Sequence, residues 1–131
     1  MESRAQKASD LKKSGKYNCA QAIACTYCDF ADADEKTMYD VMQAFGVGMG
    51  TLDGTCGSII GAGAVLGLAN KDKSKTVREM RSIMNEFKAK NGTVTCKTLK
   101  GLETGVVLRE CVDCVKDAAE LLERQLDPES L

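Results

Sequence analysis

Residues 54–70 read GTCGSIIGAGAVLGLAN, a run of 17 residues that contains no charged side chain. Five of these residues are glycine, and the run is at the short limit for a membrane span, which needs about 20 apolar residues. It therefore predicts a buried internal helix over residues 55–69. The spacing by four of Gly57 with Gly61, and of Gly63 with Gly67, would let neighbouring backbones approach this helix closely.

The sequence on either side of this run predicts further helices and no sheet. Capping residues, glycine stops and apolar spacing place them over residues 2–13, 19–30, 35–45, 74–90 and 110–126, with a short turn of helix after Thr95. The best candidate for a strand is only residues 105–108. We expect an all-α fold: one domain over residues 1–131, a compact bundle in which about six to seven helices surround the glycine-rich one.

Composition excludes several classes of protein. Hydrophobic residues make up 44% of the chain and charged residues 28%, a globular balance that excludes a disordered chain. Aromatic residues are 5%, Trp is absent and the net charge is −1, so we expect no nucleic-acid binding. The absence of His excludes Cys–His zinc sites and imidazole catalysis, and no haem is expected. No secretory signal is visible at the start of the chain, which predicts a cytoplasmic protein without a membrane span.

Cysteine is the chemically informative residue type. The chain has seven of them: Cys19, Cys25, Cys28, Cys56, Cys96, Cys111 and Cys114. An odd number cannot pair completely within one chain, so a homodimer joined near Cys25 is one interpretation. In a reducing cytosol, cysteines are more often redox-active or metal-bound than structural.

Three cysteines directly follow residues that favour helix starts. Cys19 follows Asn18, Cys56 follows Thr55 and Cys96 follows Thr95. A thiol in a first helical turn faces free backbone N–H groups and the positive end of the helix dipole, which favour the thiolate. The alternative interpretation is that small capping residues and small buried cysteines often coincide.

Helical periodicity separates the remaining cysteines. In the helix predicted over residues 19–30, Cys25 lies nearly opposite the apolar stripe and is expected to be exposed, while Cys28 flanks the stripe. In the last helix Cys111 lies beside the stripe and Cys114 nearer its edge. The two CxxC pairs could together hold zinc, but both fall inside predicted helices rather than in tight turns.

The stretch from Gly46 to Gly54 contains four glycines and invites comparison with a phosphate-binding loop. It lacks the Gly-x4-Gly-Lys-Ser/Thr pattern, and no strand precedes it, so this interpretation is weak. We expect a tight loop that folds over the helix start at Cys56. Asp53 is expected to cap that helix, with a role as proton acceptor for Cys56 as the alternative.

Several segments together resemble the C-GCAxxG-C-C family of redox-active proteins. The segments that carry the resemblance are Asn18-Cys19-Ala20-Gln21, Phe45-Gly46 with Gly48-Met49-Gly50, Cys56-Gly57-Ser58-Ile59-Ile60-Gly61-Ala62, Val65-Leu66-Gly67-Leu68 and Cys111-Val112-Asp113-Cys114-Val115. Ser58 stands where the family motif has Ala, a change that should not disturb packing. The resemblance covers residues 15 to 125.

The resemblance implies a set of four site cysteines. They are Cys19, Cys56, Cys96 and Cys111, with Cys114 as the other candidate for the fourth member. Cys28, Gly57 and Gly61 are secondary candidates. These four are the candidate redox thiols and equally the candidate ligands of a metal or cluster.

The residues leave three functions open, of which the first, a redox protein, divides into two chemistries. The cysteines could hold an iron–sulfur cluster for electron transfer, or cycle between dithiol and disulfide with an unidentified partner protein. The wide separation of the four along the chain slightly favours a cluster. The alternatives are a zinc-binding or other thiolate-metal module, and a helical scaffold whose cysteines only pack.

Overall fold

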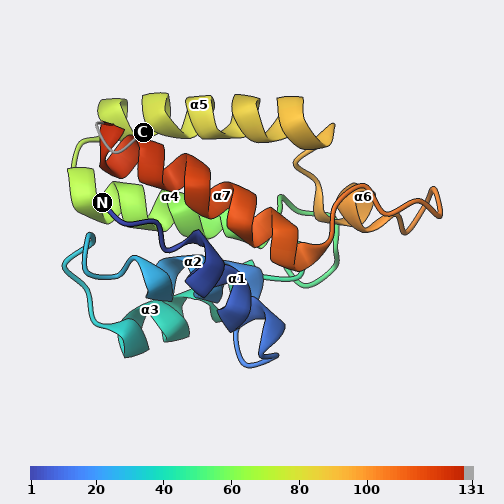
Figure 1. The fold of residues 1–131 in the computed structure, drawn as a ribbon, viewed down its shortest axis with the longest axis horizontal. Coiled ribbons are helices and arrows are strands. Elements are labelled where there is room, and N and C mark those ends of the chain that lie inside the picture. Colours follow the sequence, from blue (N-terminus) through green and yellow to red (C-terminus); the bar gives the residue numbers. More distant parts are fainter. Residues whose placement is uncertain (129–131) are drawn as a thin grey trace.

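The computed structural model describes residues 1–128, and over these residues the chain is all-α (Figure 1). Its elements are α1 (Ala5–Lys13), α2 (Cys19–Thr26), α3 (Glu35–Val41), the 3₁₀ turn η1 (Met42–Phe45), α4 (Gly57–Asn70), α5 (Lys73–Asn91), α6 (Cys96–Lys100) and α7 (Cys111–Leu126). Within this part of the chain there is no strand, only an isolated antiparallel bridge between Thr55 and Thr95. The predicted all-α class is confirmed. No helix of residues 1–128 combines the length and apolarity required to cross a membrane.

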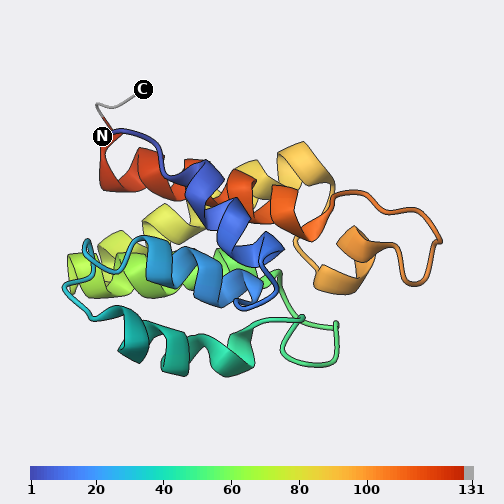
Figure 2. The same ribbon diagram turned by 60° about the horizontal axis from the view of Figure 1, so that its bottom comes forward.

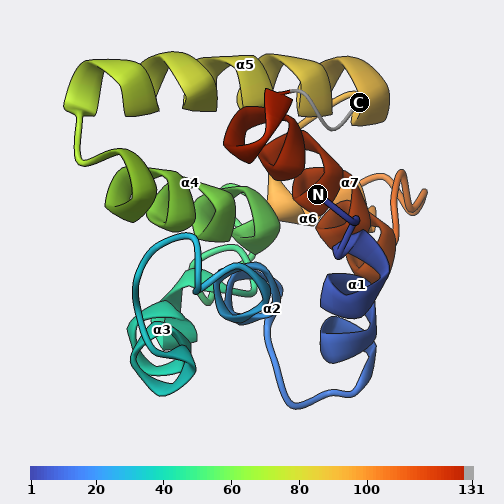
Figure 3. The same cartoon turned by 60° about the vertical axis from the view of Figure 1, so that its left-hand side comes forward.

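The glycine-rich helix α4 lies between α5 on one side and α2 on the other, with α7 alongside (Figure 3). Gly57 and Gly61 form the surface of α4 that meets α2. A Cβ on Gly61 would lie 2.6 Å from the carbonyl oxygen of Ala20, and one on Gly57 would lie 2.8 Å from that of Phe45. Gly63 and Gly67 have no such close neighbour, so close backbone approach is confined to the first two turns of α4.

Helix α2 is shorter than expected, ending at Thr26 instead of near Phe30. The Arg4 guanidinium explains this: its Nη1 donates to the Thr26 carbonyl oxygen at 3.0 Å, and both terminal nitrogens bind the Asp29 carboxylate. The chain after Thr26 therefore continues as turns, and Cys28 lies outside any helix. The helix expected over residues 35–45 is α-helical only to Val41 and continues as the 3₁₀ turn η1, and the remaining boundaries differ from the expected ones by at most three residues, as at α1, which begins at Ala5.

The expectation that Cys25 is exposed is wrong, because only 5% of its surface is accessible. All eight residues of α2 are buried, since α1, α3, α4 and α7 pack around it. A helix surrounded on every side has no solvent face, so its apolar stripe carries no information about exposure.

The expectation that Asp53 caps the glycine-rich helix is also wrong. The N-cap residue of α4 is Cys56, with no side-chain cap bond, and the exposed Asp53 carboxylate accepts instead from Lys97 Nζ at 3.2 Å. Backbone bonds join the loop before α4 to the start of α6. Cys56 N donates to Val94 O at 2.8 Å, and Cys96 N donates to Gly54 O at 2.9 Å. These bonds bring Cys56 and Cys96 to one end of the bundle, where residues 101–109 project (Figure 2).

Candidate redox site

Five cysteines from four separate helix starts line one cavity at this end of the bundle. They are Cys19, Cys56, Cys96, Cys111 and Cys114. Cys19, Cys96 and Cys111 are the first residues of α2, α6 and α7, and Cys56 is the N-cap of α4. The structure thus brings together the four expected candidates and adds Cys114. Both Cys111 and Cys114 line the cavity, so its lining does not select one of them as the fourth member of the site.

The start of α2 is fixed by Asn18, whose two hydrogen-bonding roles place Cys19. The Asn18 side chain accepts from Gln21 N at 2.7 Å, and its Nδ2 donates to Met42 O at 3.1 Å. The Gln21 side chain completes the capping box by accepting from Asn18 N at 2.8 Å. Gly46 packs against Asn18 so closely that a Cβ there would lie 2.4 Å from Asn18 Cγ. The motif residues around Cys19 therefore hold its position.

Cys111 and Cys19 form the outer thiol pair. Cys111 is half-buried and Cys19 is buried, and both side chains line the cavity. A hydrogen bond from Cys19, together with the ammonium groups of Lys100 and Lys12, lowers the pKa of Cys111 to about 6, against the usual 9.0. The same bond and burial raise the pKa of Cys19. Cys111 is therefore the thiolate of this pair at neutral pH, and Cys19 is its proton-bearing neighbour.

Cys56 and Cys114 form the inner thiol pair. A hydrogen bond from Cys114 and the hydroxyl and amide of Ser58 lower the pKa of Cys56 to about 7. The Ser58 Oγ lies 3.0 Å from Cys56 Sγ and is fully buried. The bond to Cys56 and burial raise the pKa of Cys114. Sequence reasoning treated Ser58 only as a packing change; its position two residues after a helix-start cysteine was the signal that its hydroxyl could reach the sulfur.

Cys96 is the fifth thiol of the cavity and belongs to neither pair. Burial raises its pKa, as do the nearby charges of Cys56 and Cys111, although Lys100 opposes this. Cys96 is therefore protonated at neutral pH and less reactive than Cys111.

The charged side chains that line the cavity are all positive: Lys12, Lys100 and Arg109. Arg109 is held by the buried Asp117, with its Nε and Nη2 each 3.0 Å from a carboxylate oxygen. Sequence reasoning missed all three cations, because they come from α1, α6 and the segment before α7 and no local motif joins them. Together they make the cavity favourable to negative charge.

Cys25 and Cys28 lie away from this cavity, and neither lines it. Cys25 Sγ donates to the Glu35 carbonyl oxygen at 3.6 Å, and burial raises its pKa to about 12. Burial also raises the pKa of Cys28. The structure therefore does not bring the two CxxC pairs together as a four-cysteine zinc site would need. The buried Cys25 is also poorly placed for a bond to a second chain.

The fit of the thiols to a metal can be judged from their arrangement. Among residues 1–128, no three Cys, Asp or Glu side chains are grouped closely enough to hold one metal ion. Within the cavity, Cys19 and Cys111 shift each other's pKa values in opposite directions, as do Cys56 and Cys114, and Cys96 is the remaining thiol.

Comparison with known proteins adds one finding. No curated protein and no solved structure matches the chain significantly. The sequence profile of one family matches residues 17–125, a range that contains all seven cysteines and every residue that lines the cavity except Lys12. The match spans most of the chain, which therefore belongs to the family described as "Putative redox-active protein (C_GCAxxG_C_C)".

Proposed function

We propose that this protein carries electrons by thiol–disulfide exchange, with Cys111 as the reacting thiol and Cys19 as its resolving partner. The observation that carries the proposal is the Cys19–Cys111 pair at the start of α7, beside Lys100 and Lys12. A thiolate next to cations and a second thiol is the arrangement that disulfide exchange requires.

The exchange has two steps that balance without another reagent. The Cys111 thiolate attacks one sulfur of a partner's disulfide, forming a mixed disulfide and releasing the partner's first thiolate. Cys19 transfers its proton to that thiolate and attacks Cys111 Sγ, which releases the partner's second thiolate. The partner disulfide is thereby reduced to a dithiol, one proton being taken from water, and Cys19–Cys111 is oxidised. The reverse sequence restores the dithiol.

The inner pair would increase the number of electrons that the site can store. Cys111 and Cys114 are three residues apart on α7, so their side chains lie on the same face of the helix. Disulfide exchange between them would pass oxidation from the outer pair to Cys56–Cys114 and free Cys111 for a second reaction. Two pairs would store four electrons, which leaves Cys96 as a spare thiol.

The test is a thiol count with disulfide mapping on protein equilibrated with reduced and oxidised glutathione. We expect the free thiols to fall from seven to three on oxidation, with bonds at 19–111 and 56–114. Cys111→Ser should remove the first bond, and Cys28→Ser, outside the cavity, should leave both. Oxidation confined to Cys25 and Cys28, or seven thiols under all conditions, would overturn the proposal.

An iron–sulfur cluster is the second candidate, favoured by the observation that five thiols line one cavity. Such a cluster would be held by thiolates of this set and would supply one-electron chemistry. A visible spectrum of protein purified without oxygen, with iron, sulfide and zinc analysis, distinguishes the candidates. Absorption at roughly 400 nm with matching iron and sulfide would favour the cluster. A colourless, metal-free protein with the expected disulfides favours thiol exchange, and bound zinc alone favours the thiolate-metal module.

We retain the prediction of a cytoplasmic location as part of this proposal. A protein that works by reversible oxidation of thiols suits a compartment that re-reduces them. The redox partner is defined here only by its chemistry, a protein or small molecule with an exchangeable disulfide or dithiol.

A further inference from the structure

The cavity beside the thiol pairs is small. Its volume is about 30 Å³. One water molecule needs about 10–15 Å³ of cavity volume, so the space accommodates roughly two oxygen-sized atoms. Its walls are the cysteine sulfurs together with apolar side chains such as Val47 and Leu99. A peptide disulfide is too large for this space, whereas a molecule of two linked oxygen atoms fits it.

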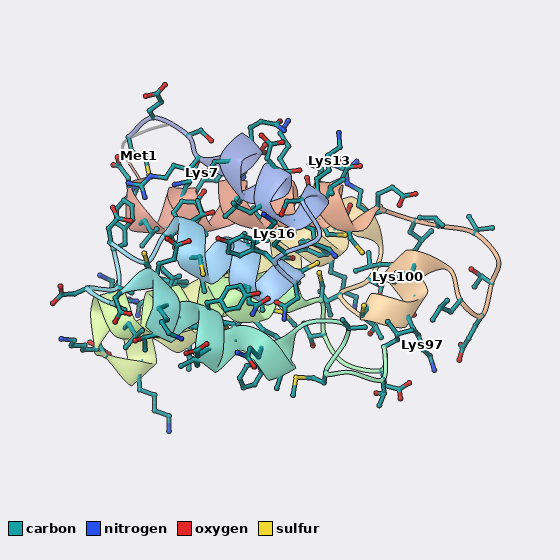
Figure 4. The ribbon with its side chains drawn as sticks, turned by 90° about the horizontal axis from the view of Figure 1, so that it is seen from below. Met1, Lys7, Lys13, Lys16, Lys97 and Lys100 are labelled. Atoms are coloured by element: carbon teal, nitrogen blue, oxygen red, sulfur yellow. The ribbon has the colours of Figure 1, made fainter. Side chains whose placement is uncertain are left out.

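The two lysines of the cavity have no carboxylate partner among the described residues. Both lysines line the cavity with Cys111, and their positive charges favour its thiolate. The neighbouring Lys97, on the same helix, differs: its Nζ lies 2.7 Å from a Glu103 oxygen and 3.2 Å from Asp53. Figure 4 shows Lys97 on the outer side of α6 and Lys100 on the side toward the body of the molecule.

Cys111 can be reached from two sides. Besides the inner cavity, it lines a shallow outer groove with Lys100, Leu102, Val107 and Glu110. A bulky disulfide or dithiol can approach through the outer groove, while a small oxidant can occupy the inner cavity. Cys19 lies deeper in the cavity, next to Cys111.

From these features we propose that a small hydroperoxide, hydrogen peroxide in the simplest case, is the oxidant that this site accepts. The inference rests on the proposed function, because it uses the same Cys19–Cys111 pair. In this proposal the peroxide occupies the inner cavity, and the Lys100 ammonium group stabilises negative charge on the departing oxygen.

The chemistry balances with the peroxide as the only oxidant. The Cys111 thiolate attacks one peroxide oxygen, the O–O bond breaks, and the departing hydroxide takes a proton from solvent and leaves as water. Cys111 becomes a sulfenic acid. The Cys19 sulfur then attacks Cys111 Sγ; its proton and the S–OH group leave as a second water, and a disulfide forms. A dithiol reductant approaching through the outer groove returns the pair to the reduced state.

The experiment follows oxidation of reduced protein by hydrogen peroxide in the absence of oxygen. In Cys19→Ser/Cys114→Ser, which removes both thiols that could resolve it, a sulfenic acid should be trapped by dimedone at Cys111. Its formation should be at least about ten-fold faster than oxidation of the half-buried Cys28 of the same chain. Lys100→Gln should slow the reaction by about ten-fold, which corresponds to about 1.4 kcal/mol less stabilisation of the charge on the departing oxygen. Lys97→Gln, the matched control, should change the rate less than two-fold.

A second experiment tests the size of the cavity with oxidants of different size and needs no substitution. Cumene hydroperoxide, whose bulky aromatic group leaves it only the outer groove, away from Lys12 and Cys19, should oxidise Cys111 at least about ten-fold more slowly than hydrogen peroxide, since the cavity holds roughly two oxygen-sized atoms. Equal rates for the two oxidants would overturn the proposal. So would equal effects of Lys100→Gln and Lys97→Gln on the rate with hydrogen peroxide.

Failure of this inference can be distinguished from failure of the proposed function by a parallel reaction with glutathione disulfide. If Cys111 exchanges with glutathione disulfide but reacts with peroxide no faster than Cys28, the peroxide assignment is overturned and thiol exchange stands. If Cys111 is unreactive toward both, both proposals are overturned.

Discussion

Cys111 shows most clearly how the fold changes the chemistry of a single residue. A free thiol is mostly protonated at neutral pH, but Cys111 lies at the first position of α7, hydrogen-bonded by Cys19 and next to Lys100. Each of these contacts favours the thiolate over the thiol. The neighbouring Cys114, one turn further along the same helix, donates to the Arg109 carbonyl oxygen at 3.9 Å, and its interaction with Cys56 together with burial raises its pKa.

This difference predicts the pH dependence of alkylation. The rate of reaction of Cys111 with iodoacetamide should rise with pH to a plateau with a midpoint near 6. Lys100→Gln removes a cation that stabilises the thiolate, so the midpoint should move to higher pH and the rate below the midpoint should fall, by about ten-fold if the pKa rises by about one. Mass spectrometry of the alkylated peptide at each pH gives the curve. A midpoint at the usual thiol value of 9.0, or an equal change in Lys97→Gln, would contradict the prediction.

At this scale the sequence could reveal part of the site. Capping residues marked the helix starts at Cys19 and Cys96, and family resemblance added Cys111. Cys114 was left uncertain because helical periodicity describes one helix, whereas its partner Cys56 is on another. Lys12 and Lys100 could not be found at all, since their approach to Cys111 depends on how α1 and α6 pack.

At the scale of elements, the contact between α2 and α4 determines where Cys19 and Cys56 lie. The absence of a side chain at Gly61 allows the two backbones to meet. Gly61→Ala places a Cβ 2.6 Å from the Ala20 carbonyl oxygen, so α2 must shift, at a cost of about 1–3 kcal/mol in the free energy of unfolding. Urea denaturation followed by circular dichroism measures this cost.

Gly67→Ala on the same helix is the matched control. Nothing lies within 4 Å of a Cβ at Gly67, so alanine there should stabilise the protein by about 0.5–1 kcal/mol through the lower entropy of the unfolded chain. If both variants change stability in the same direction, close packing at Gly61 is not what sets the helix spacing.

The sequence predicted which segments form helices more reliably than it predicted where each helix ends. The uncharged run at residues 54–70 and the apolar spacing of the last helix were local signals, and both helices are present. The end of α2 was not readable, because it depends on Arg4, more than 20 residues away, bonding to Thr26 and Asp29. The burial of Cys25 likewise depends on helices that enclose α2 from all sides.

At the scale of the whole molecule, the perturbed thiols make stability depend on pH. Cys111 and Cys56 have pKa values lowered to about 6 and about 7, so their contribution is complete above the unfolded value of 9.0 and is lost as pH falls through 7 and 6. Cys19 and Cys114 have raised pKa values, so their contribution is present below 9.0 and is lost as pH rises above it.

The reduced protein should therefore be most stable near pH 9, with stability falling on both sides. Urea midpoints between pH 5 and 10, measured with a reductant present, test this expectation. Cys111→Ser should reduce the rise between pH 6 and 9, while Cys28→Ser should leave it in place. A flat profile over this range in the unaltered protein would show that the thiols titrate alike in the folded and unfolded chain.

Oxidation should change the stability of the whole chain, because the proposed outer disulfide joins the start of α2 to the start of α7. The N-terminal amino group is already paired with Asp127, and Arg4 N donates to Glu123, so α1 and α7 pack as one unit. A bond between residues 19 and 111 closes a loop of about 90 residues, for which loop entropy predicts about 4–5 kcal/mol and measured disulfides typically give 2–4 kcal/mol.

Oxidised protein should therefore unfold in one transition at a higher urea concentration than reduced protein. Cys111→Ser should lose the contribution of this bond and retain only that of the bond between residues 56 and 114. Equal midpoints for the oxidised and reduced forms would contradict the pairing, and two separate transitions would contradict a single domain over residues 1–131.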